Sequence, residues 1–394
     1  MPASVAAGTY GCSGLDADDI HPLRDHSGMG IAIWLKGMRP QTLPASVAPV
    51  VIGAAAAWTS VRQLGVCSLI YPAPESCAIN RATQTMLESR FWPLAILCAL
   101  VALFLQIAVN FANDYSDGVR GTDEGRGAAL SASPTSSESH GIPPTAVVPS
   151  GRCDGVAATP IHAPVRLVAS GVPPKRVLAA SGIAAGLACL CGLAVIVITG
   201  HWWLLAVGVC CLLAGWCYTG GRHPYGYAGL GELFVFVFFG LVAVLGTQFV
   251  LCGTVITMGV VGAVQAGLLS CALLMVNNLR DVDADRVHGK RTLAVRLGEC
   301  RARILTVVTY WVGVCPSMML ELALLAMFAI QVGHYPAAVS YGSGWVIGLT
   351  GAVSLILAML NGCAILGRDH ARALPLTSLS LLVCAMGYVG MAVL

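Results

Sequence analysis

Long, uninterrupted apolar runs alternate with short polar segments along most of this chain. The runs have at least the roughly 17 residues that a helix needs to cross a bilayer. Their apolar residues are continuous and do not alternate with polar ones, which favours helices over the strands of a membrane barrel. The pattern predicts an all-α integral membrane protein with about nine transmembrane helices, at approximately residues 41–60, 91–112, 177–199, 202–219, 228–251, 254–277, 304–331, 345–366 and 374–394.

Composition supports the membrane class. Of 394 residues, 57% are hydrophobic and only 10% are charged, and the mean hydropathy is +0.78. Soluble domains carry roughly 25% charged residues, so a soluble fold is excluded. The net charge of +3 is too small to indicate a nucleic-acid partner. The Cys residues form no CxxC pair, and only Cys67 and Cys77 share a polar segment in which a disulfide could form in an oxidising compartment.

The distribution of Lys and Arg predicts the orientation. If the N-terminus lies inside, the outside segments hold only Arg62, Arg81 and Arg90, and all other Lys and Arg of the 22 fall inside. The positive-inside rule then places the N-terminus in the cytoplasm and the C-terminus outside. We expect a multi-pass protein of the cytoplasmic (inner) membrane with its polar, functional edge facing the cytoplasm.

The segments outside the apolar runs define the domain organisation. Residues 1–28 form a polar, disordered leader without the features of a signal peptide, and residues 29–394 form the polytopic membrane domain. Two segments are expected insertions: an outside loop at 61–90, and a disordered cytoplasmic loop at 127–164 that is rich in Ser, Thr, Pro, Gly and Ala.

Two clusters of acidic residues lie at the cytoplasmic ends of the second and sixth runs. Asp114 and Asp117 are three residues apart and share a helix face, and Asp281 and Asp285 are four apart and do the same. Stacked carboxylates repel one another unless a cation lies between them, and hard oxygen ligands suit Mg²⁺, which shares itself with phosphate oxygens. The predicted metal ligands are Asn113, Asp114, Asp117, Asp123, Asp281 and Asp285.

Basic residues follow both acidic clusters and are candidates for binding a polyanion. The predicted diphosphate ligands are Arg120, Arg280, Lys290 and Arg291. A diphosphate on a long apolar tail fits this edge, because its head meets the water and its tail lies among apolar helices. The alternative is that these segments are ordinary juxtamembrane loops, but two related clusters favour a functional site.

Four stretches in order resemble the UbiA superfamily of intramembrane aromatic prenyltransferases. They are KGMRPQTLPASVAPVVIG from Lys36, NDYSDGVRGTD from Asn113, YTGGRHPYGYAGLGE from Tyr218 and NNLRDVDADRVHGKRTLAVRLG from Asn277. Within that family they are similar to the menaquinone-pathway enzymes that act on 1,4-dihydroxy-2-naphthoate. The resemblance covers about residues 30–394, and the departures from it are the leader and the two insertions.

The resemblance implies a fold, a cofactor and a reaction. The family has nine transmembrane helices around a central cavity, and its acidic motifs bind Mg²⁺ and a polyprenyl diphosphate. The leaving diphosphate generates an allylic cation, and the naphthoate ring attacks it with loss of CO₂ to give demethylmenaquinol. Asp114, Asp117, Asp281 and Asp285 are then the expected catalytic residues.

Other polar residues are weaker candidates for this site. Asn110 and Asn277 either support the metal ligands or pack helices together. Glu232 begins the fifth run and either has a function or caps that helix. The expected aromatic-substrate residues are Arg39, Tyr218, His223 and Tyr225.

Competing functions remain open from sequence. One is a UbiA-type enzyme with another acceptor, such as 4-hydroxybenzoate. An ion transporter would place its acids near the bilayer midplane and not at one edge. A CDP-alcohol phosphotransferase would show the DGxxAR pattern, which this sequence lacks.

Overall fold

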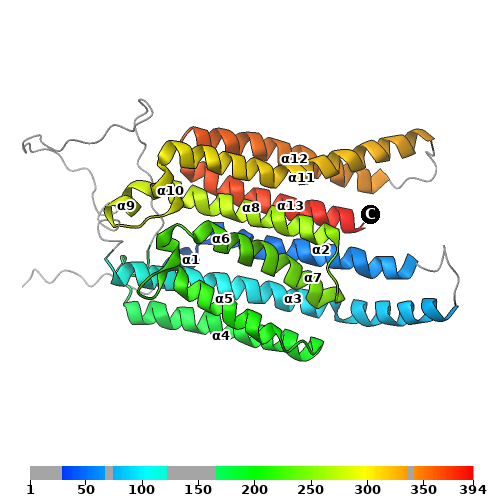
Figure 1. Cartoon of the computed structure of the whole chain (residues 1–394), viewed down its shortest axis with the longest axis horizontal. Coiled ribbons are helices and arrows are strands. Elements are labelled where there is room, and N and C mark those ends of the chain that lie inside the picture. Colours follow the sequence, from blue (N-terminus) through cyan, green and yellow to red (C-terminus); the bar gives the residue numbers. More distant parts are fainter. Residues whose placement is uncertain (1–28, 67–73, 122–165, 335–340, 394) are drawn as a thin grey trace, which may run out of the picture.

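The computed structural model describes residues 29–66, 74–121, 166–334 and 341–393. Every regular element in these ranges is helical (Figure 1). The elements are α1 (Met29–Gly37), η1 (Pro40–Thr42), α2 (Pro44–Val66), α3 (Pro74–Val119), α4 (Pro174–Thr199), α5 (Leu204–Thr219), η3 (Tyr225–Ala228), α6 (Gly231–Val235), the π-helix η4 (Phe236–Leu245), α7 (Gly246–Cys252), α8 (Thr257–Arg280), α9 (Val282–Val287), α10 (Leu293–Leu297), α11 (Glu299–His334), α12 (Tyr341–Leu366) and α13 (His370–Val393).

The predicted all-α membrane fold is confirmed. Eight helical segments of the described chain are long and apolar enough to cross a membrane, and α5 is a shorter apolar helix that matches the remaining predicted run. The run predicted at 228–251 is one span built from α6, η4 and α7 in succession. The protein is therefore a multi-pass membrane protein, as its composition predicts.

The segment 61–90 differs from its prediction as a loop. Helix α2 continues to Val66 and α3 begins at Pro74, so only residues 67–73 lie outside the described chain. The polar residues of this stretch are good helix formers, and the side chain of Gln84 donates a hydrogen bond to Glu88 one turn later at 2.9 Å. The leader 1–28 and the insertion 127–164 fall on residues that the structure does not describe, and so does Cys67, on which the pairing with Cys77 depends.

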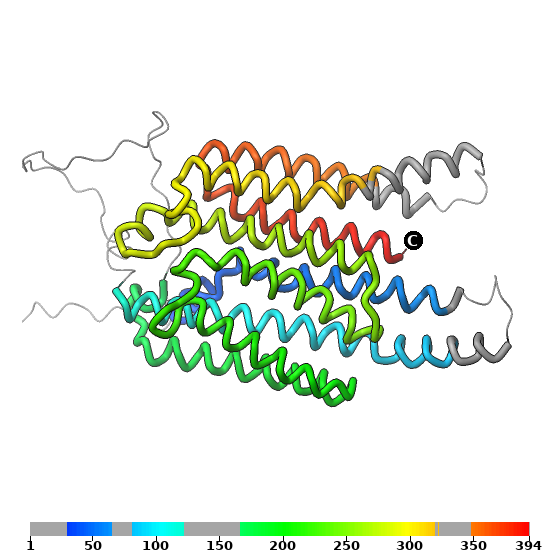
Figure 2. Tube along the Cα trace, in the orientation of Figure 1, coloured from blue at the N-terminus to red at the C-terminus, as the bar shows by residue number. Residues whose placement is uncertain are grey.

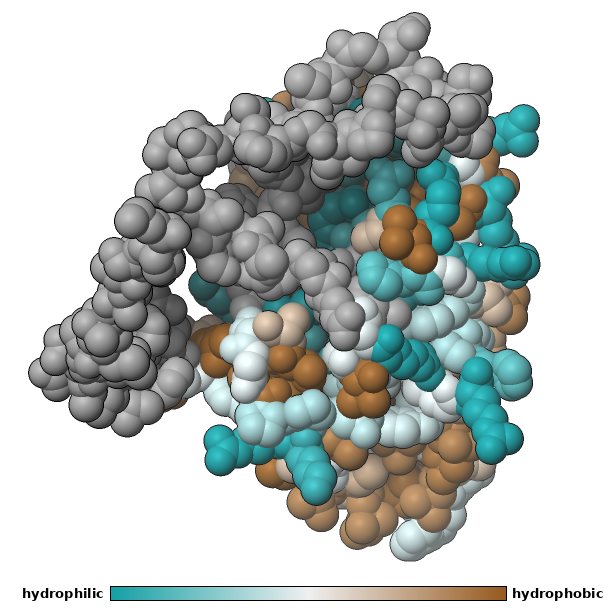
Figure 3. Space-filling model, turned by 90° about the vertical axis from the view of Figure 1, so that its left-hand side faces the viewer, coloured by the Kyte–Doolittle hydropathy of each residue, from teal (hydrophilic) through white to brown (hydrophobic). Residues whose placement is uncertain are grey.

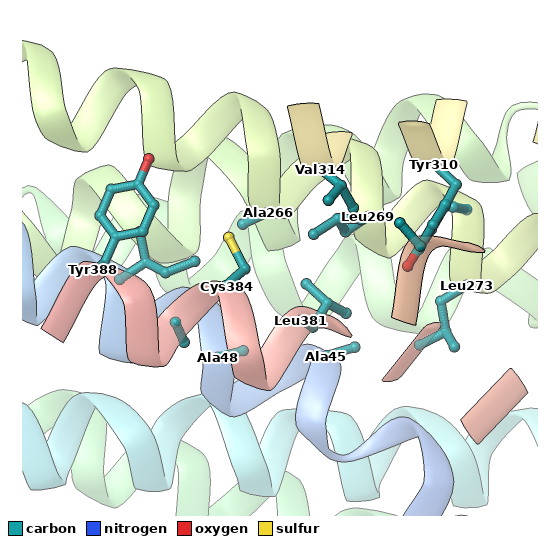
Figure 4. Packing of buried hydrophobic residues seen from close by; sticks show 14 of the residues in the cluster. Ala45, Ala48, Ala266, Leu269, Leu273, Tyr310, Val314, Leu381, Cys384 and Tyr388 are labelled. Carbon is teal, nitrogen blue, oxygen red and sulfur yellow. The ribbon is translucent and has the colours of Figure 1, made fainter. Parts of the chain in front are cut away.

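The long helices run side by side along the length of the molecule (Figures 1 and 2). Helices α2, α8 and α13 lie centrally, with α11 and α12 on one side and α3, α4 and α5 on the other. The main core joins α2, α8, α11 and α13, and Figure 4 shows Leu269, Tyr310 and Tyr388 packed within it. Small residues allow close approach, because a Cβ on Gly262 would lie only 2.4 Å from Ile52 Cγ2.

Three of the short helices lie at one end of the bundle. Helices α1, α9 and α10 lie at the left of Figure 1, and the C-terminus lies toward the opposite end. Seen from that end, the molecule carries many hydrophilic side chains beside its apolar flank (Figure 3). Both acidic motifs belong to this end, because α3 and α8 each finish there.

Candidate functional site

The last turns of α3 carry the first acidic motif, and two buried amides hold this part of the helix in place. Asn110 donates to the backbone oxygen of Met38 at 2.8 Å and to Thr42 Oγ1 at 3.3 Å. Asn113 accepts a hydrogen bond from Thr219 Oγ1 at 2.6 Å. Asn110 thus ties α3 to the turn before α2, while Asn113 ties it to the end of α5. The contacts of Asn110 are those of a packing amide.

Asp114 is almost fully buried, with 1% of its surface exposed, and is bound from the segment 166–173. The backbone N–H of Leu167 donates to Asp114 Oδ2 at 2.7 Å. The segment fits closely against its neighbours, since a Cβ on Gly118 would lie 2.5 Å from Val168 Cβ and one on Gly37 would lie 2.7 Å from Leu167 Cδ1. Glycine at both positions therefore lets this segment reach the carboxylate.

Asp117 is contacted by several side chains at once. Lys290 Nζ donates to its Oδ1 at 3.0 Å, and Arg166 Nη1 lies 3.5 Å from its Oδ2. The hydroxyl of Tyr227 also donates to Oδ1, and Lys290 lies 4.6 Å from the centre of the Tyr227 ring. Burial, followed by the charge of Asp117, raises the pKa of Tyr227, so this phenol is a neutral donor. All four groups come from different segments of the chain.

Sequence reasoning missed two of these residues. Arg166 was counted only as one of the inside charges, although it directly precedes a short apolar stretch, LVASG, that packs onto α3. The second missed residue is Tyr227, because the sequence prediction names only its neighbour Tyr225, as an aromatic-substrate residue. In a 3₁₀ helix, residues two apart point about 240° apart around the axis, so only one of the two tyrosines can face the acidic motif. The one-residue spacing between the two tyrosines was the sequence feature that could have indicated Tyr227 as a second candidate.

The second acidic motif lies at the junction of α8 and α9. Arg280 holds Asp281 in a two-bond ion pair, with Nε and Nη2 each 3.0 Å from a carboxylate oxygen. The backbone N–H of Asp285 donates to the backbone oxygen of Asp281 at 2.8 Å, so one helical turn persists between the two acids. Asp285 is buried, and Asn277, one turn before Asp281, is half-buried. The predicted shared face is therefore retained across the helix break.

The loop after the second motif reaches the first motif. Lys290 binds Asp117, and the backbone N–H of its neighbour Arg291 donates to the backbone oxygen of Tyr227 at 2.9 Å. The side chain of Arg291 is exposed. The chain therefore brings together two clusters that are more than 150 residues apart in sequence, as Lys290 and Asp117 are separated by 173 positions.

Arg39 lies between the two motifs. Its backbone adopts a left-handed conformation with φ 53°, which is uncommon for a residue other than glycine. Its Nη2 is buried without a hydrogen-bond partner. Burial, and next the charge of Arg166, lower the pKa of Arg39 to about 10, while Asp114 and Asp117 partly oppose this and Arg280 adds to it. Arg39 is therefore a charged donor with spare hydrogen-bonding capacity.

Arg120 has a structural role in this arrangement. Its guanidinium donates to the backbone oxygens of Thr219 and Gly221, and it lies 5.3 Å from the centre of the Tyr227 ring. It therefore fixes the turn that follows α5 and supports the tyrosine that binds the first motif.

The predicted aromatic-substrate residues separate into two groups. Tyr218 is half-buried, and its ring meets that of Tyr225 edge to face at 5.5 Å. The Tyr225 hydroxyl donates to the Ala214 oxygen at 2.8 Å and the ring stacks on Phe234 at 4.0 Å, so its side chain is used in packing. His223 is exposed on the loop. Tyr218, like Arg39, therefore stays near the acidic motifs, whereas His223 and Tyr225 do not take part in them.

The donor set fits Mg²⁺. Carboxylates and an amide oxygen from two elements are the hard ligands that this ion prefers, and Mg²⁺ usually takes only one or two protein carboxylates beside phosphate oxygens and water. Among the described residues, no three His, Cys, Asp or Glu side chains form a ready-made metal centre. Asp123, the remaining predicted ligand, lies outside the described residues.

Comparison with known proteins decides the family. The chain is 41% identical over 276 residues to 1,4-dihydroxy-2-naphthoate octaprenyltransferase of Mycobacterium tuberculosis, covering 70% of this chain and 73% of that protein. The chain belongs to the UbiA prenyltransferase family. The model of that family matches residues 157–350. The protein of the same name from Mycobacterium leprae is 35% identical over 348 residues, covering 82% of this chain and 97% of that protein.

A solved structure is also similar in outline. The structure of a UbiA homolog from Archaeoglobus fulgidus bound to DMAPP and Mg²⁺ covers 92% of this chain and 99% of its own, with a TM-score of 0.46 and 13% sequence identity. The family resemblance predicted from the four sequence stretches is thus confirmed by the sequence relatives, and this UbiA-family member is an enzyme of the prenyltransferase class.

Proposed function

We propose that this UbiA-family protein transfers a polyprenyl group from a polyprenyl diphosphate to 1,4-dihydroxy-2-naphthoate. Diphosphate and CO₂ leave, and the product is demethylmenaquinol. The names of the relatives support this activity. The observation that carries it in the structure is the Asp117 cluster, in which a buried carboxylate and two buried cations meet at the polar end of an apolar helical bundle.

The residues of the chain have distinct roles in this proposal. Asp114 and Asp117 from α3, with Asn113, and Asp281 and Asp285 from the second motif would hold Mg²⁺. The ion, when bound, supplies positive charge that stabilises the leaving diphosphate. Lys290 and Arg166 lie at the carboxylate of Asp117, so they are placed to bind diphosphate oxygens beside the metal ligands.

The other substrate groups also find matching chemistry. Arg39 offers a charged, unpaired donor between the two motifs, which suits the carboxylate of the naphthoate. The prenyl tail is apolar and belongs among the membrane helices. Closing the site with Lys290, Arg166 and Tyr227 keeps water from the allylic cation, which would otherwise be captured as an alcohol.

We also propose an orientation of the protein in the membrane. The positive-inside rule places both motifs at the cytoplasmic face of the inner membrane, where a water-soluble naphthoate and Mg²⁺ are available. The N-terminus then lies in the cytoplasm and the C-terminus outside.

A prenyl-transfer assay in liposomes tests this function. Purified protein is given a labelled polyprenyl diphosphate with 1,4-dihydroxy-2-naphthoate or 4-hydroxybenzoate, in Mg²⁺ or in EDTA. We expect Mg²⁺-dependent product and CO₂ release with the naphthoate. Product with 4-hydroxybenzoate alone would change the acceptor, and no product with either would refute the proposal.

A matched pair of variants assigns the diphosphate site. Lys290→Met removes a buried cation that contacts Asp117, whereas Arg222→Met removes an exposed one from a loop at the same end. We expect the first change to raise the KM for polyprenyl diphosphate at least about tenfold, because one charged hydrogen bond contributes about 1.5–3 kcal/mol. The second should leave it unchanged.

A further inference from the structure

One carboxylate of the spanning helices takes no part in the cluster described above. Glu232 lies in the first turn of α6, at the start of the span Gly231–Cys252. Its Oε1 accepts a hydrogen bond from Asn278 Nδ2 at 3.0 Å, and no Lys or Arg of the described chain forms an ion pair with it. A carboxylate in a span without a cation is costly, and such residues mark function by default.

The surroundings of Glu232 are mostly apolar. It lines a small cavity between α6, α8, α10 and α11 whose other walls are almost entirely apolar, formed by Met275, Leu293, Ala294, Leu297, Ala302, Leu305 and Thr306. Its titratable neighbours are Tyr218 from α5 and Cys271 from α8, whose Sγ donates to the Glu232 backbone oxygen at 3.0 Å. Glu232 itself is half-buried, so its side chain lies at the edge of this apolar cavity.

Tyr218 connects Glu232 to the acidic motifs. The Tyr218 hydroxyl lies 3.7 Å from the position of a Cβ on Gly231, the residue before Glu232. The charges of Glu232, Asp117 and Arg39 all act on this tyrosine. An aromatic acceptor held by Arg39 would therefore lie on the Tyr218 side of the site, with a ring hydroxyl directed toward Tyr218 and Glu232.

We propose that Glu232 is the proton acceptor for a ring hydroxyl of the aromatic substrate, with Tyr218 passing the proton and Asn278 holding the carboxylate. This inference rests on the proposed function. The hydroxyl proton moves to Glu232, and the naphtholate electron pair makes the ring a stronger nucleophile. Carbon–carbon bond formation breaks the carbon–oxygen bond to diphosphate, and loss of CO₂ returns its bonding pair to the ring. The proton then goes back to the ring oxygen.

This sequence is balanced without a net proton. The naphthoate enters with one negative charge on its carboxylate. After the reaction this charge is on the released diphosphate, and CO₂ departs neutral. A group that takes up the hydroxyl proton and later returns it is consistent with this balance, and the Glu232 carboxylate can do both.

Glu232→Gln tests the inference in the full-length protein in liposomes, after wild-type transfer to 1,4-dihydroxy-2-naphthoate has been established. We expect kcat to fall by about 10²–10⁴-fold, the usual range for losing a general base, while Mg²⁺-dependent binding of the prenyl diphosphate is unchanged. The matched control is Glu299→Gln, because Glu299 lies at the same end of the bundle but pairs with Arg303 and Arg368. This control should keep wild-type turnover.

A second acceptor separates proton transfer from a structural role. A naphthoate with an electron-withdrawing ring substituent has a more acidic hydroxyl, already ionised at the assay pH, so Glu232→Gln should use it nearly as well as the wild type. Equal losses with both acceptors, or turnover within about threefold of wild type with the natural one, would overturn the inference. If the Gln variant fails to fold, Glu232→Asp is measured in the same way, since it keeps the carboxylate and shortens its reach. If the wild type itself transfers no prenyl group to the naphthoate, the proposed function fails instead.

Discussion

Replacing Asp117 by Asn should destabilise the folded protein strongly. Asp117 and its partners Lys290 and Arg166 have side chains that are only 4%, 9% and 7% exposed, and the closest contact is 3.0 Å. The Asn side chain keeps the shape but removes the charge, so two buried cations lose their main compensation. Breaking a buried ion pair in this way costs about 3–5 kcal/mol, because the remaining charge stays desolvated.

The assay is equilibrium unfolding in mixed detergent micelles, with Asp283→Asn as the matched control. Asp283 also forms an ion pair at this end, 3.6 Å from Arg286, but its side chain is 92% exposed and that of its partner 56%. Water screens such a pair, so removing it should change the free energy of unfolding by less than about 1 kcal/mol. If Asp117→Asn costs no more than this control, the reasoning from burial is refuted.

A double-mutant cycle with Lys290→Met measures the pair itself. We expect the double variant to be more stable than the sum of the single changes by roughly 0.5–3 kcal/mol, since neighbouring residues in one network are not additive. It should not recover wild-type stability, because Arg166 still faces a neutral amide. Strict additivity would show that Lys290 and Asp117 do not interact in the membrane-embedded protein.

Three further predictions concern the surroundings of the cluster. Gly118→Ala should cost about 1–3 kcal/mol of stability and raise the KM for the polyprenyl diphosphate, because the added Cβ would lie 2.5 Å from the segment that binds the first motif. Gly182→Ala, with nothing within 4 Å of its Cβ, should not destabilise the protein in the same equilibrium-unfolding assay. Tyr227→Phe should lower kcat/KM about tenfold by removing a hydrogen bond to a charged acid, whereas Tyr225→Phe should keep activity, and the reverse order would contradict the assignment. Arg39→Met should raise the KM for the naphthoate about tenfold or more without changing that for the prenyl diphosphate. In the wild type, the same KM should stay flat near neutral pH and rise only as the pH approaches about 10, where Arg39 loses its proton.

The sequence by itself determined the membrane class, the helices and the two acidic motifs. Apolar runs of spanning length leave the backbone no other structure in a bilayer, since every N–H and C=O must be satisfied within the segment. The spacing of Asp114 and Asp117, and of Asp281 and Asp285, also follows from the helical repeat. The loop expected at 61–90 shows the limit of this reasoning, because polar residues extend helices beyond the membrane as readily as they form loops.

Only the tertiary structure decided which groups meet the acids. Lys290 reaches Asp117 across 173 positions, and Arg166 arrives from a segment whose short apolar stretch packs against glycines in other elements. Neither contact can be recognised from a periodic pattern in the nearby sequence. Each depends on separate helices ending at the same depth in the membrane. The choice of Tyr227 over Tyr225 depends likewise on how one short helix is rotated against α3. The sequence pattern thus shows which residues share a helix face. The packing of the helices determines which of these faces another segment contacts.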